Sequence, residues 1–452
     1  MRIKFLGGAR TVTGSLFLYN NRFLIEAGLF QGHREEAEQI NRNPPIDLSQ
    51  ISAILLTHAH LDHSGNIPNL IKKGYQGPIY ATQATIEITS LLLRDAAHIF
   101  EQDIAYLNKK LRKKGLPEKE PLYTIDDVER SLQHFEPIPY HHPFQIGDET
   151  ITFFDAGHIL GSAQIRLEGP KGSILFSGDL GRRGMPFLRD PELGIKTEVL
   201  VLESTYGGRN HEELTTVKEK LIQLINKINR RKSRLLIPAF AVERTQDLIY
   251  LLHELEDEIP PVPIYVDSPL AQNVTRIFKS HVELYDREAK ELIQNNDDPL
   301  GFGHLHYIRD VEESKWLNDR EGPLIIISAS GMCEGGRILH HLKRSLTNPD
   351  DIVLFVGFQA RNTLGRRLID GVKEVKVFGE EYPVRCEIVR IDGLSSHADQ
   401  NDLITYVKSI PELKRIFLIH GEEEEMETLA EKLKSSFTGQ IDLPQLGEEF
   451  QF

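Results

Sequence analysis

Short apolar runs alternate with turns over the first 206 residues and predict a β-rich region. Runs such as RFLIEAG, ISAILLTHAH and TITFFDAGH are rich in β-branched and aromatic residues, and Gly, Asp or Asn residues bound them. Residues 83–114 depart from this pattern, because their apolar positions recur at helical spacing and predict one long helix. Several of the strands end near an acid, base or metal-binding side chain: Glu26, His58, His158, Asp179 and Glu203.

From about residue 207 the pattern changes to strands that alternate with helices. The strands, such as RLLIPAFA, PLIIISAS and DIVLFVGF, are almost continuously apolar, which is typical of a parallel sheet with helices on both faces. The helices are expected over residues 212–230, 243–256, 269–278 and 336–346. After about residue 377 short strands return. We therefore expect residues 207–377 to form an inserted α/β domain, and residues 378–452 to rejoin a first domain that begins with residues 1–206.

Composition narrows the class of protein. A chain of 452 residues has room for two or three domains, and 53 basic against 67 acidic residues give a net charge of −14. This balance argues against nucleic-acid binding by bulk charge, although two local basic runs occur at residues 109–115 and 229–234. Solvated helix ends explain both runs equally well. Two cysteines, Cys333 and Cys386, are too few for a disulfide framework.

No membrane or secretory segment is expected from the sequence. The longest apolar runs fall well short of the roughly 18 residues of a membrane span. The first residues, MRIKFLGGAR, read as the beginning of a strand and lack the pattern of a secretory leader. We therefore expect a cytoplasmic protein without a membrane partner.

The segment LLTHAHLDHSGN carries the strongest chemical signal. It follows an apolar strand and places three imidazoles and a carboxylate within six residues, a donor set that zinc prefers. Three more donors stand at later strand ends, and seven donors suit two metal ions about 3.5–4 Å apart. The alternatives are a chance histidine-rich turn for the first cluster and isolated structural residues for the later ones. The seven candidates are His58, His60, Asp62, His63, His158, Asp179 and His420.

These motifs resemble those of the metallo-β-lactamase superfamily, and specifically of its β-CASP branch of RNA-processing nucleases. Glu203 in LESTYG, His397 in GLSSHADQ and His420 in LIHGE are similar to motifs A, B and C of that branch. Further matches include GARTVTGS, VDSPLA and SASGMCEGGRILHHLK, and the likeness extends over essentially the whole chain. The HAHLDH spelling and the histidine at motif C are typical of the 3′-end-processing members, so the chain looks like a bacterial relative of that endonuclease branch.

The resemblance implies a fold and a set of roles. The fold would be a four-layer αββα metallo-β-lactamase sandwich with an inserted parallel-sheet β-CASP domain as a lid, and the substrate would lie between the two domains. His58, His60 and His158 would hold one zinc. Asp62, His63 and His420 would hold the other, and Asp179 would bridge both. Glu203 would orient and charge His397, and manganese is an alternative to zinc.

The implied reaction is hydrolysis of phosphodiester bonds in single-stranded RNA. A hydroxide that bridges two metal ions is nucleophilic at neutral pH and would attack phosphorus, with Asp62 as part of the catalytic machinery. His397 would protonate the leaving 3′-oxygen, so the products would be a 5′-phosphate and a 3′-hydroxyl. For substrate binding, Ser330 and Gly331 open a helix that could receive a phosphate, and Arg361 follows the next strand. A tight turn and a solvated helix explain these last three residues equally well.

One position departs from the family pattern. LIEAGLFQG has Glu26 where the family usually has an aspartate that supports the zinc loop from behind the ligands. The longer side chain leaves all seven donors in place.

Three other functions stay open at this point. The first is a hydrolase of a small phosphodiester or thioester on the same fold, which the size of the inserted domain disfavours. The second is a 5′-to-3′ exoribonuclease. The third is an RNA-binding scaffold without activity, which the complete donor set disfavours. The sequence does not fix the oligomeric state, and a homodimer stays open.

Overall fold

A computed structural model describes residues 1–31, 34–360 and 362–452. The chain divides into two compact units. Unit 1 contains residues 1–183, 190–210 and 397–452, and unit 2 contains residues 184–189 and 211–396.

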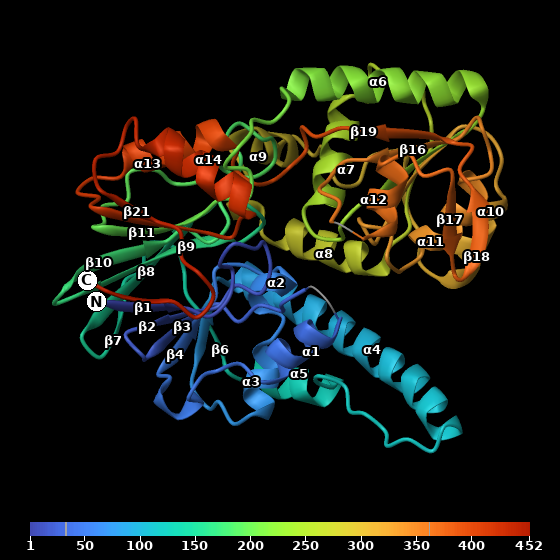
Figure 1. Cartoon of the computed structure of the whole chain (residues 1–452). Helices are drawn as coiled ribbons and strands as arrows, with labels where there is room; N and C mark the ends of the chain where they lie inside the picture. Colours follow the sequence, from blue (N-terminus) through green and yellow to red (C-terminus); the bar gives the residue numbers. More distant parts are fainter. Residues whose placement is uncertain (32–33, 361) are drawn as a thin grey trace. The chain divides into compact units, whose positions relative to one another are not determined.

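Unit 1 is built on two seven-stranded sheets (Figure 1). The first sheet has the strand order β22 (Glu449–Gln451), β1 (Arg2–Phe5), β2 (Phe17–Tyr19), β3 (Phe23–Ile25), β4 (Ala53–Leu55), β5 (Ile79–Ala81) and β6 (Phe135–Pro137). The second has the order β21 (Gln440–Asp442), β20 (Arg415–Ile419), β11 (Val199–Glu203), β10 (Gly172–Phe176), β9 (Ala163–Gly169), β8 (Glu149–Asp155) and β7 (Phe144–Ile146).

Apolar side chains from both sheets meet in one core. Phe5 and Phe17 of the first sheet pack with Phe153, Phe176 and Phe417 of the second, and all five are buried. Strand β8 shows the expected period of two, because only its alternate residues are buried. All residues of β11 are buried, since its second face is covered by helices.

Helices cover the outer face of each sheet. Residues of α3 pack on the first sheet, and residues of α13 and α14 pack on the second. The result is the four-layer αββα sandwich that the sequence predicts. Among the described residues, no helix combines the length and hydropathy of a membrane span. The helices are α1 (Arg34–Arg42), the 3₁₀ turn η1 (Leu48–Gln50), α2 (Leu61–Ser64), α3 (Ile67–Lys72), α4 (Gln83–Lys113), α5 (Ile125–Leu132), α13 (Gln400–Ser409) and α14 (Glu423–Leu433).

Unit 2 contains a six-stranded, fully parallel sheet. Its strand order is β14 (Leu305–Tyr307), β13 (Ile264–Val266), β15 (Leu324–Ser328), β12 (Arg234–Pro238), β16 (Ile352–Phe355) and β19 (Glu387–Arg390). All residues of β12 are buried, because α6 and α11 both pack against it. The other elements are a hairpin of β17 (Glu374–Val377) and β18 (Glu380–Pro383), and α6 (Leu214–Arg231), α7 (Arg244–Glu254), α8 (Pro269–Ser280), η2 (Val282–Leu284), α9 (Arg287–Gln294), α10 (Val311–Asp319), α11 (Ile338–Ser345) and α12 (Leu364–Ile369).

The structure differs from the expected organisation in two places. The expected helices end within two residues of the observed ones, but the charged stretch after α8 also contains α9, β14 and α10. The C-terminal boundary of the inserted domain also moves. Residues 378–396 belong to unit 2 and not to the first domain, because β19 pairs in register with β16, with Val353 opposite Ile388.

Candidate metal centre

The candidate residues of unit 1 converge because the strands before them point the same way. Strands β8, β10, β11 and β20 are parallel to one another in the second sheet, and β3 is parallel to β4 in the first. His158 and Asp179 each lie three residues after a strand, and His420 comes directly after β20. Six segments far apart in sequence therefore deliver polar side chains to one edge of the sandwich.

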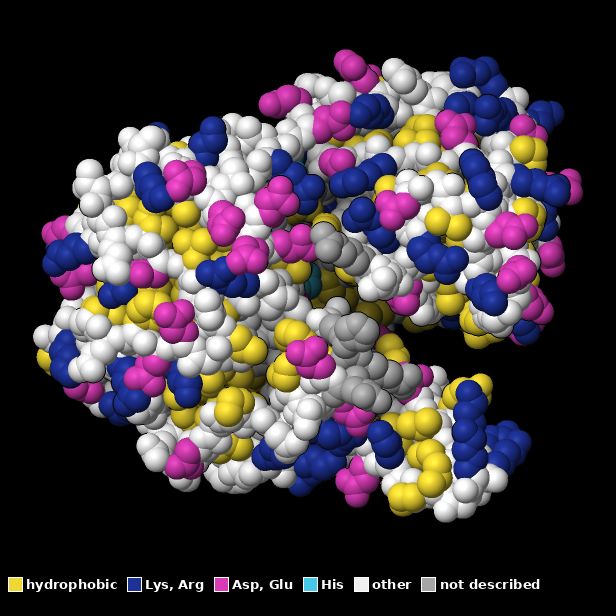
Figure 2. Space-filling view, viewed as in Figure 1, with side chains coloured by type: hydrophobic (Ala, Val, Ile, Leu, Met, Phe, Trp, Pro, Cys, Tyr) yellow, Lys and Arg dark blue, Asp and Glu magenta, His cyan; other side chains and the backbone are white. Residues whose placement is uncertain are grey.

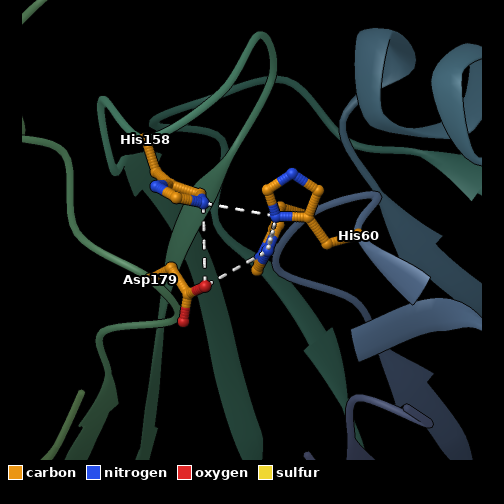
Figure 3. Close-up of side chains that lie close together, drawn as sticks. His60, His158 and Asp179 are labelled. Atoms are coloured by element: carbon orange, nitrogen blue, oxygen red, sulfur yellow. Dashed lines mark hydrogen bonds and ion pairs between the residues drawn. The ribbon is translucent and has the colours of Figure 1, made fainter. Parts of the chain in front are cut away.

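The first group of donors is His58, His60, His158 and Asp179, of which Figure 3 labels the last three. Nε2 of His58 lies 3.1 Å from Nδ1 of His60, and Nε2 of His158 lies 3.3 Å from the same atom. Oδ2 of Asp179 is 3.5 Å from Nε2 of His58 and 3.6 Å from Nε2 of His158. Three nitrogens and one oxygen thus surround a common centre.

The second group shares Asp179 with the first. Nε2 of His63 lies 3.4 Å from Oδ2 of Asp179 and 3.8 Å from Oδ2 of Asp62. Nε2 of His420 lies 3.9 Å from Oδ2 of Asp62 and 3.7 Å from the other oxygen of Asp179, Oδ1. The carboxylate of Asp179 therefore lies between the two groups.

The spacing and the chemistry of these atoms fit divalent metal ions. A tetrahedral zinc with ligands at about 2.0–2.1 Å separates its ligand atoms by about 3.3 Å, close to the distances in the first group. Nε2 of His63 and Oδ1 of Asp179 are buried, and neither makes a hydrogen bond within the described part of the chain. Buried polar atoms without a hydrogen-bond partner, surrounded by nitrogen and oxygen donors, are the arrangement that a bound cation satisfies.

The electrostatics of the centre separate neutral from charged groups. Burial lowers the pKa of His58 well below its usual value and lowers that of His60 to about 4, so both imidazoles are neutral, the form that binds metals. Burial also opposes the charge on Asp179, but the nearby His420, His63 and His58 outweigh it and hold the pKa of that carboxyl well below its usual range. Asp179 is thus an anion at the middle of the centre.

Three side chains hold the far nitrogens of the histidines. Oε2 of Glu26 lies 2.7 Å from Nδ1 of His63. The glutamate that replaces the usual aspartate therefore still contacts the imidazole, on the nitrogen away from the donor groups. The sequence did not single out Thr57 or Ser15, whose hydroxyls lie 3.0 Å from Nδ1 of His58 and Nδ1 of His420. Thr57 directly precedes the HAHLDH motif, and Ser15 is the last residue of GARTVTGS. Both therefore belong to motifs that the sequence indicates, but only the fold shows their contacts with the histidines.

Glu203 and His397 form a pair beside the first group. Oε1 of Glu203 lies 3.2 Å from Nδ1 of His397 and also accepts the backbone N–H of Leu180 at 2.7 Å. His397 is held in place by a β-bridge to Gly181. Burial alone would lower the pKa of His397, but the Glu203 carboxylate outweighs it and raises this pKa. The imidazole is therefore a potential proton donor 3.9 Å from Asp179.

A glycine lets the loop of the centre pack closely. A Cβ atom on Gly28 would lie 1.6 Å from the backbone oxygen of Asp62. That oxygen accepts the backbone N–H of Ser15 at 2.8 Å, and the N–H of Gly28 donates to Ser15 at 2.9 Å. The backbone that carries Asp62 and His63 is thus fixed by the loops before β2 and after β3.

The candidates for substrate binding lie in unit 2. The hydroxyl of Ser330 accepts the backbone N–H groups of Glu334 and Gly335 at 3.1 and 3.3 Å, so it stabilises its own loop. Gly331 lies beside the ring of Phe240. Arg361 lies outside the described residues. A role of these residues in binding RNA stays a prediction.

Three family models match successive parts of the chain. Residues 20–239 match the metallo-beta-lactamase superfamily, residues 245–368 the Beta-Casp domain, and residues 381–444 the Zn-dependent metallo-hydrolase RNA specificity domain. Ribonuclease TTHA0252 of Thermus thermophilus is 36% identical over 99% of both chains. The chain belongs to the β-CASP family of the metallo-β-lactamase superfamily. As a β-CASP protein it is a metal-dependent hydrolase.

Other β-CASP relatives show the same likeness. Transcription termination factor FttA of Methanocaldococcus jannaschii is 30% identical over 98% of this chain and 70% of its own length. The RNase J-like protein of the same organism is 29% identical over 93% of this chain and 92% of its own length. A crystal structure of a protein of unknown function from Enterococcus faecalis V583 covers 99% of both chains at a TM-score of 0.57. Its 14% identity supports the fold alone.

Gly28→Ala should displace the loop of the centre. Because the added methyl would overlap the backbone of Asp62, we expect a loss of roughly 3 kcal/mol in stability together with weaker binding of a divalent metal. Thermal unfolding and a zinc titration against a chromophoric chelator measure the two effects. Gly303→Ala, where no atom lies within 4 Å of the new Cβ, is the control. A fully stable Gly28→Ala variant with normal metal affinity would contradict this account of the loop.

Proposed function

We propose that the protein is a zinc-dependent ribonuclease that cuts single-stranded RNA internally. The observation that carries the proposal is the pair of donor groups that share Asp179, with the Glu203–His397 pair next to them. Two donor groups that share a carboxylate, with an imidazole of raised pKa beside them, suit hydrolysis of a phosphodiester, which needs an activated water and a protonated leaving group. The name of the Thermus thermophilus relative and the RNA specificity domain support RNA as the substrate.

In this proposal each side chain has one role. His58, His60 and His158 would hold one zinc, Asp62, His63 and His420 would hold the second, and Asp179 would be shared. Two zinc ions held in this way would supply a water of lowered pKa and neutralise charge on the phosphate. Glu26, Thr57 and Ser15 keep the ligating nitrogens oriented, because they occupy the opposite nitrogens of the rings.

His397 is the proton donor to the leaving 3′-oxygen. Glu203 holds its Nδ1 and favours the charged ring, and the backbone N–H groups of Leu180 and Thr205 fix the Glu203 carboxylate in turn. The products are then a 5′-phosphate on the downstream fragment and a 3′-hydroxyl on the upstream fragment.

One cleavage experiment tests the function. Single-stranded RNA labelled separately at each end is incubated with the zinc-loaded protein, and Asp62→Ala is the control for metal-dependent cleavage. Internal fragments that disappear in the control are the expected result. Mononucleotides released from the 5′ end would show that the protein is an exonuclease and not an endonuclease. If neither RNA nor matching DNA is cut by protein that holds two metal ions, the proposal fails in favour of a small-substrate hydrolase.

Asp179→Ala should remove both metal ions. Its two oxygens face the two donor groups, so its loss takes one ligand and the central negative charge from each. Metal content measured by mass spectrometry should fall from about two ions per chain to below one, and cleavage should be lost. Asp148→Ala, at an exposed carboxylate in the same unit, should change neither. If the Asp179→Ala variant retains two zinc ions, Asp179 is not a ligand shared by both.

His397→Ala should abolish cleavage but spare the metal content. Loss of a positioned proton donor costs about 100- to 10,000-fold in rate. His142→Ala, which removes an exposed imidazole of the same unit, is the control. The rate constant kcat and the metal content of each variant are measured together. Loss of zinc in His397→Ala would instead make this residue a ligand.

A further inference from the structure

Helix α4 extends beyond the core that its first half helps to form (Figure 1). Its buried residues run from Ala84 to Ala97, and after that only Asn108 is buried. The remaining part, residues 98–113, is about 24 Å long at 1.5 Å per residue. Asn108 also ties the returning chain to the helix, because its side chain exchanges two hydrogen bonds of 2.9 Å with the backbone of Lys119. Residues 98–119 therefore form a defined projection, here named the basic arm.

The charge of the basic arm is opposite to that of the whole protein. Residues 104–117 contain five basic side chains and no acidic one, although the chain carries a net charge of −14. Arg112 pairs with Glu118 at 3.2 Å. In the part of the chain that the structure describes, no ion pair involves the other four, which are Lys109, Lys110, Lys113 and Lys114.

Aromatic and basic side chains share one exposed face of the arm. Lys109 and Lys110 lie three and four residues after Tyr106, and Lys113 lies three residues after Lys110, so all four share one side of the helix. Tyr106 is 64% exposed, and Nζ of Lys110 lies 4.2 Å from its ring centroid. Ile99 is also exposed, about two turns before Tyr106. Figure 2 shows hydrophobic and basic side chains together on the projecting part at the lower right.

Ordinary helix chemistry explains only part of this surface. Basic residues in a last turn interact favourably with the helix dipole, which accounts for Lys110, Arg112 and Lys113. The dipole gives no reason for the exposed Tyr106 or the exposed Ile99. The arm of a second copy is a poor partner, because two such arms would repel each other. Unpaired cations beside an accessible aromatic ring match the surfaces that bind single-stranded nucleic acid.

We propose that the basic arm binds the RNA strand outside the metal centre. Its lysines contact phosphates and Tyr106 stacks on a base, which strengthens the hold on RNA that is long enough to reach the arm. The inference rests on the proposed ribonuclease function, and its test separates the two.

Binding is measured first, in a protein that cannot cut its ligand. Zinc-loaded His397→Ala, with and without K109A/K110A/K113A, is titrated with single-stranded RNA of about 30 nucleotides, roughly twice the largest single-strand site. Each lost phosphate contact should reduce the slope of log K against log salt by about 0.7, so we expect a reduction of about 2. K171A/K408A/K432A removes the same charge from exposed lysines of the same unit and should leave the slope nearly unchanged.

The tyrosine is tested by a matched pair. Tyr106→Ala should weaken binding by about 10-fold and Tyr106→Phe should retain it, because stacking needs the ring and not the hydroxyl. Circular dichroism melts of all variants should coincide with the parent, since each altered side chain is exposed. An unchanged salt slope and unchanged affinity in the folded variants would overturn the role of the arm.

Cleavage then separates the arm from the centre. In protein with an intact His397, K109A/K110A/K113A should raise KM for the long RNA and leave kcat/KM for an oligonucleotide of about 4 nucleotides unchanged. Equal losses of kcat/KM on the long RNA and the short oligonucleotide would overturn the proposal. So would an effect that correlates with a change in self-association, measured by sedimentation. If RNA binds through the arm but is never cut, the binding role of the arm is confirmed and the proposed ribonuclease function is wrong.

Discussion

The position of one buried carboxylate, Asp179, constrains the rest of unit 1. An anion in a protein interior is costly unless opposite charge surrounds it, and the side chain of Asp179 is only 2% exposed. Loops from both sheets place nitrogen donors around it, since His58 and His63 come from loops of the first sheet and His158 and His420 from loops of the second, and a divalent metal held by them would supply the opposite charge. The aromatic core joins the two sheets that carry these loops.

Sequence reasoning predicts the parts of this centre that depend on local order. The HAHLDH segment begins three residues after β4 ends, so its four donors are close together in any fold that begins a turn there. His397 is different, because it lies 194 positions after Glu203 and the intervening segment includes most of unit 2. Periodicity cannot join such distant segments, and the family resemblance supplied the pairing. The contacts of Thr57 and Ser15 depend on hydroxyl directions that only the packed structure fixes.

The expected boundary at residue 377 shows the same limit at the level of strands. The segment PVRCEIVRID has the short apolar pattern of a strand, and that pattern fits an edge of either unit. Only the pairing with β16, which leaves β19 at the edge of the parallel sheet, assigns it to unit 2. The surroundings of Ser330 also depend on the fold. The sequence places this serine in a segment that opens a helix, whereas in the structure it lies in the loop before α11 and accepts backbone N–H groups of that loop.

Net charge and local charge have separate consequences for a nuclease of this kind. With a net charge of −14 the protein repels polyanions at long range, and salt near 0.1 M screens that repulsion beyond about 10 Å. Affinity must then come from groups at contact distance. Part of the acidic run at the start of α14 is paired within the protein, because Glu425 contacts Arg209 and the backbone N–H of Gly208. Lys109, Lys110, Lys113 and Lys114 of the basic arm make no ion pair among the described residues. If the arm binds RNA as proposed, contact at this face together with repulsion by the acidic surface would favour one orientation of the strand, and turnover over tight, indiscriminate binding.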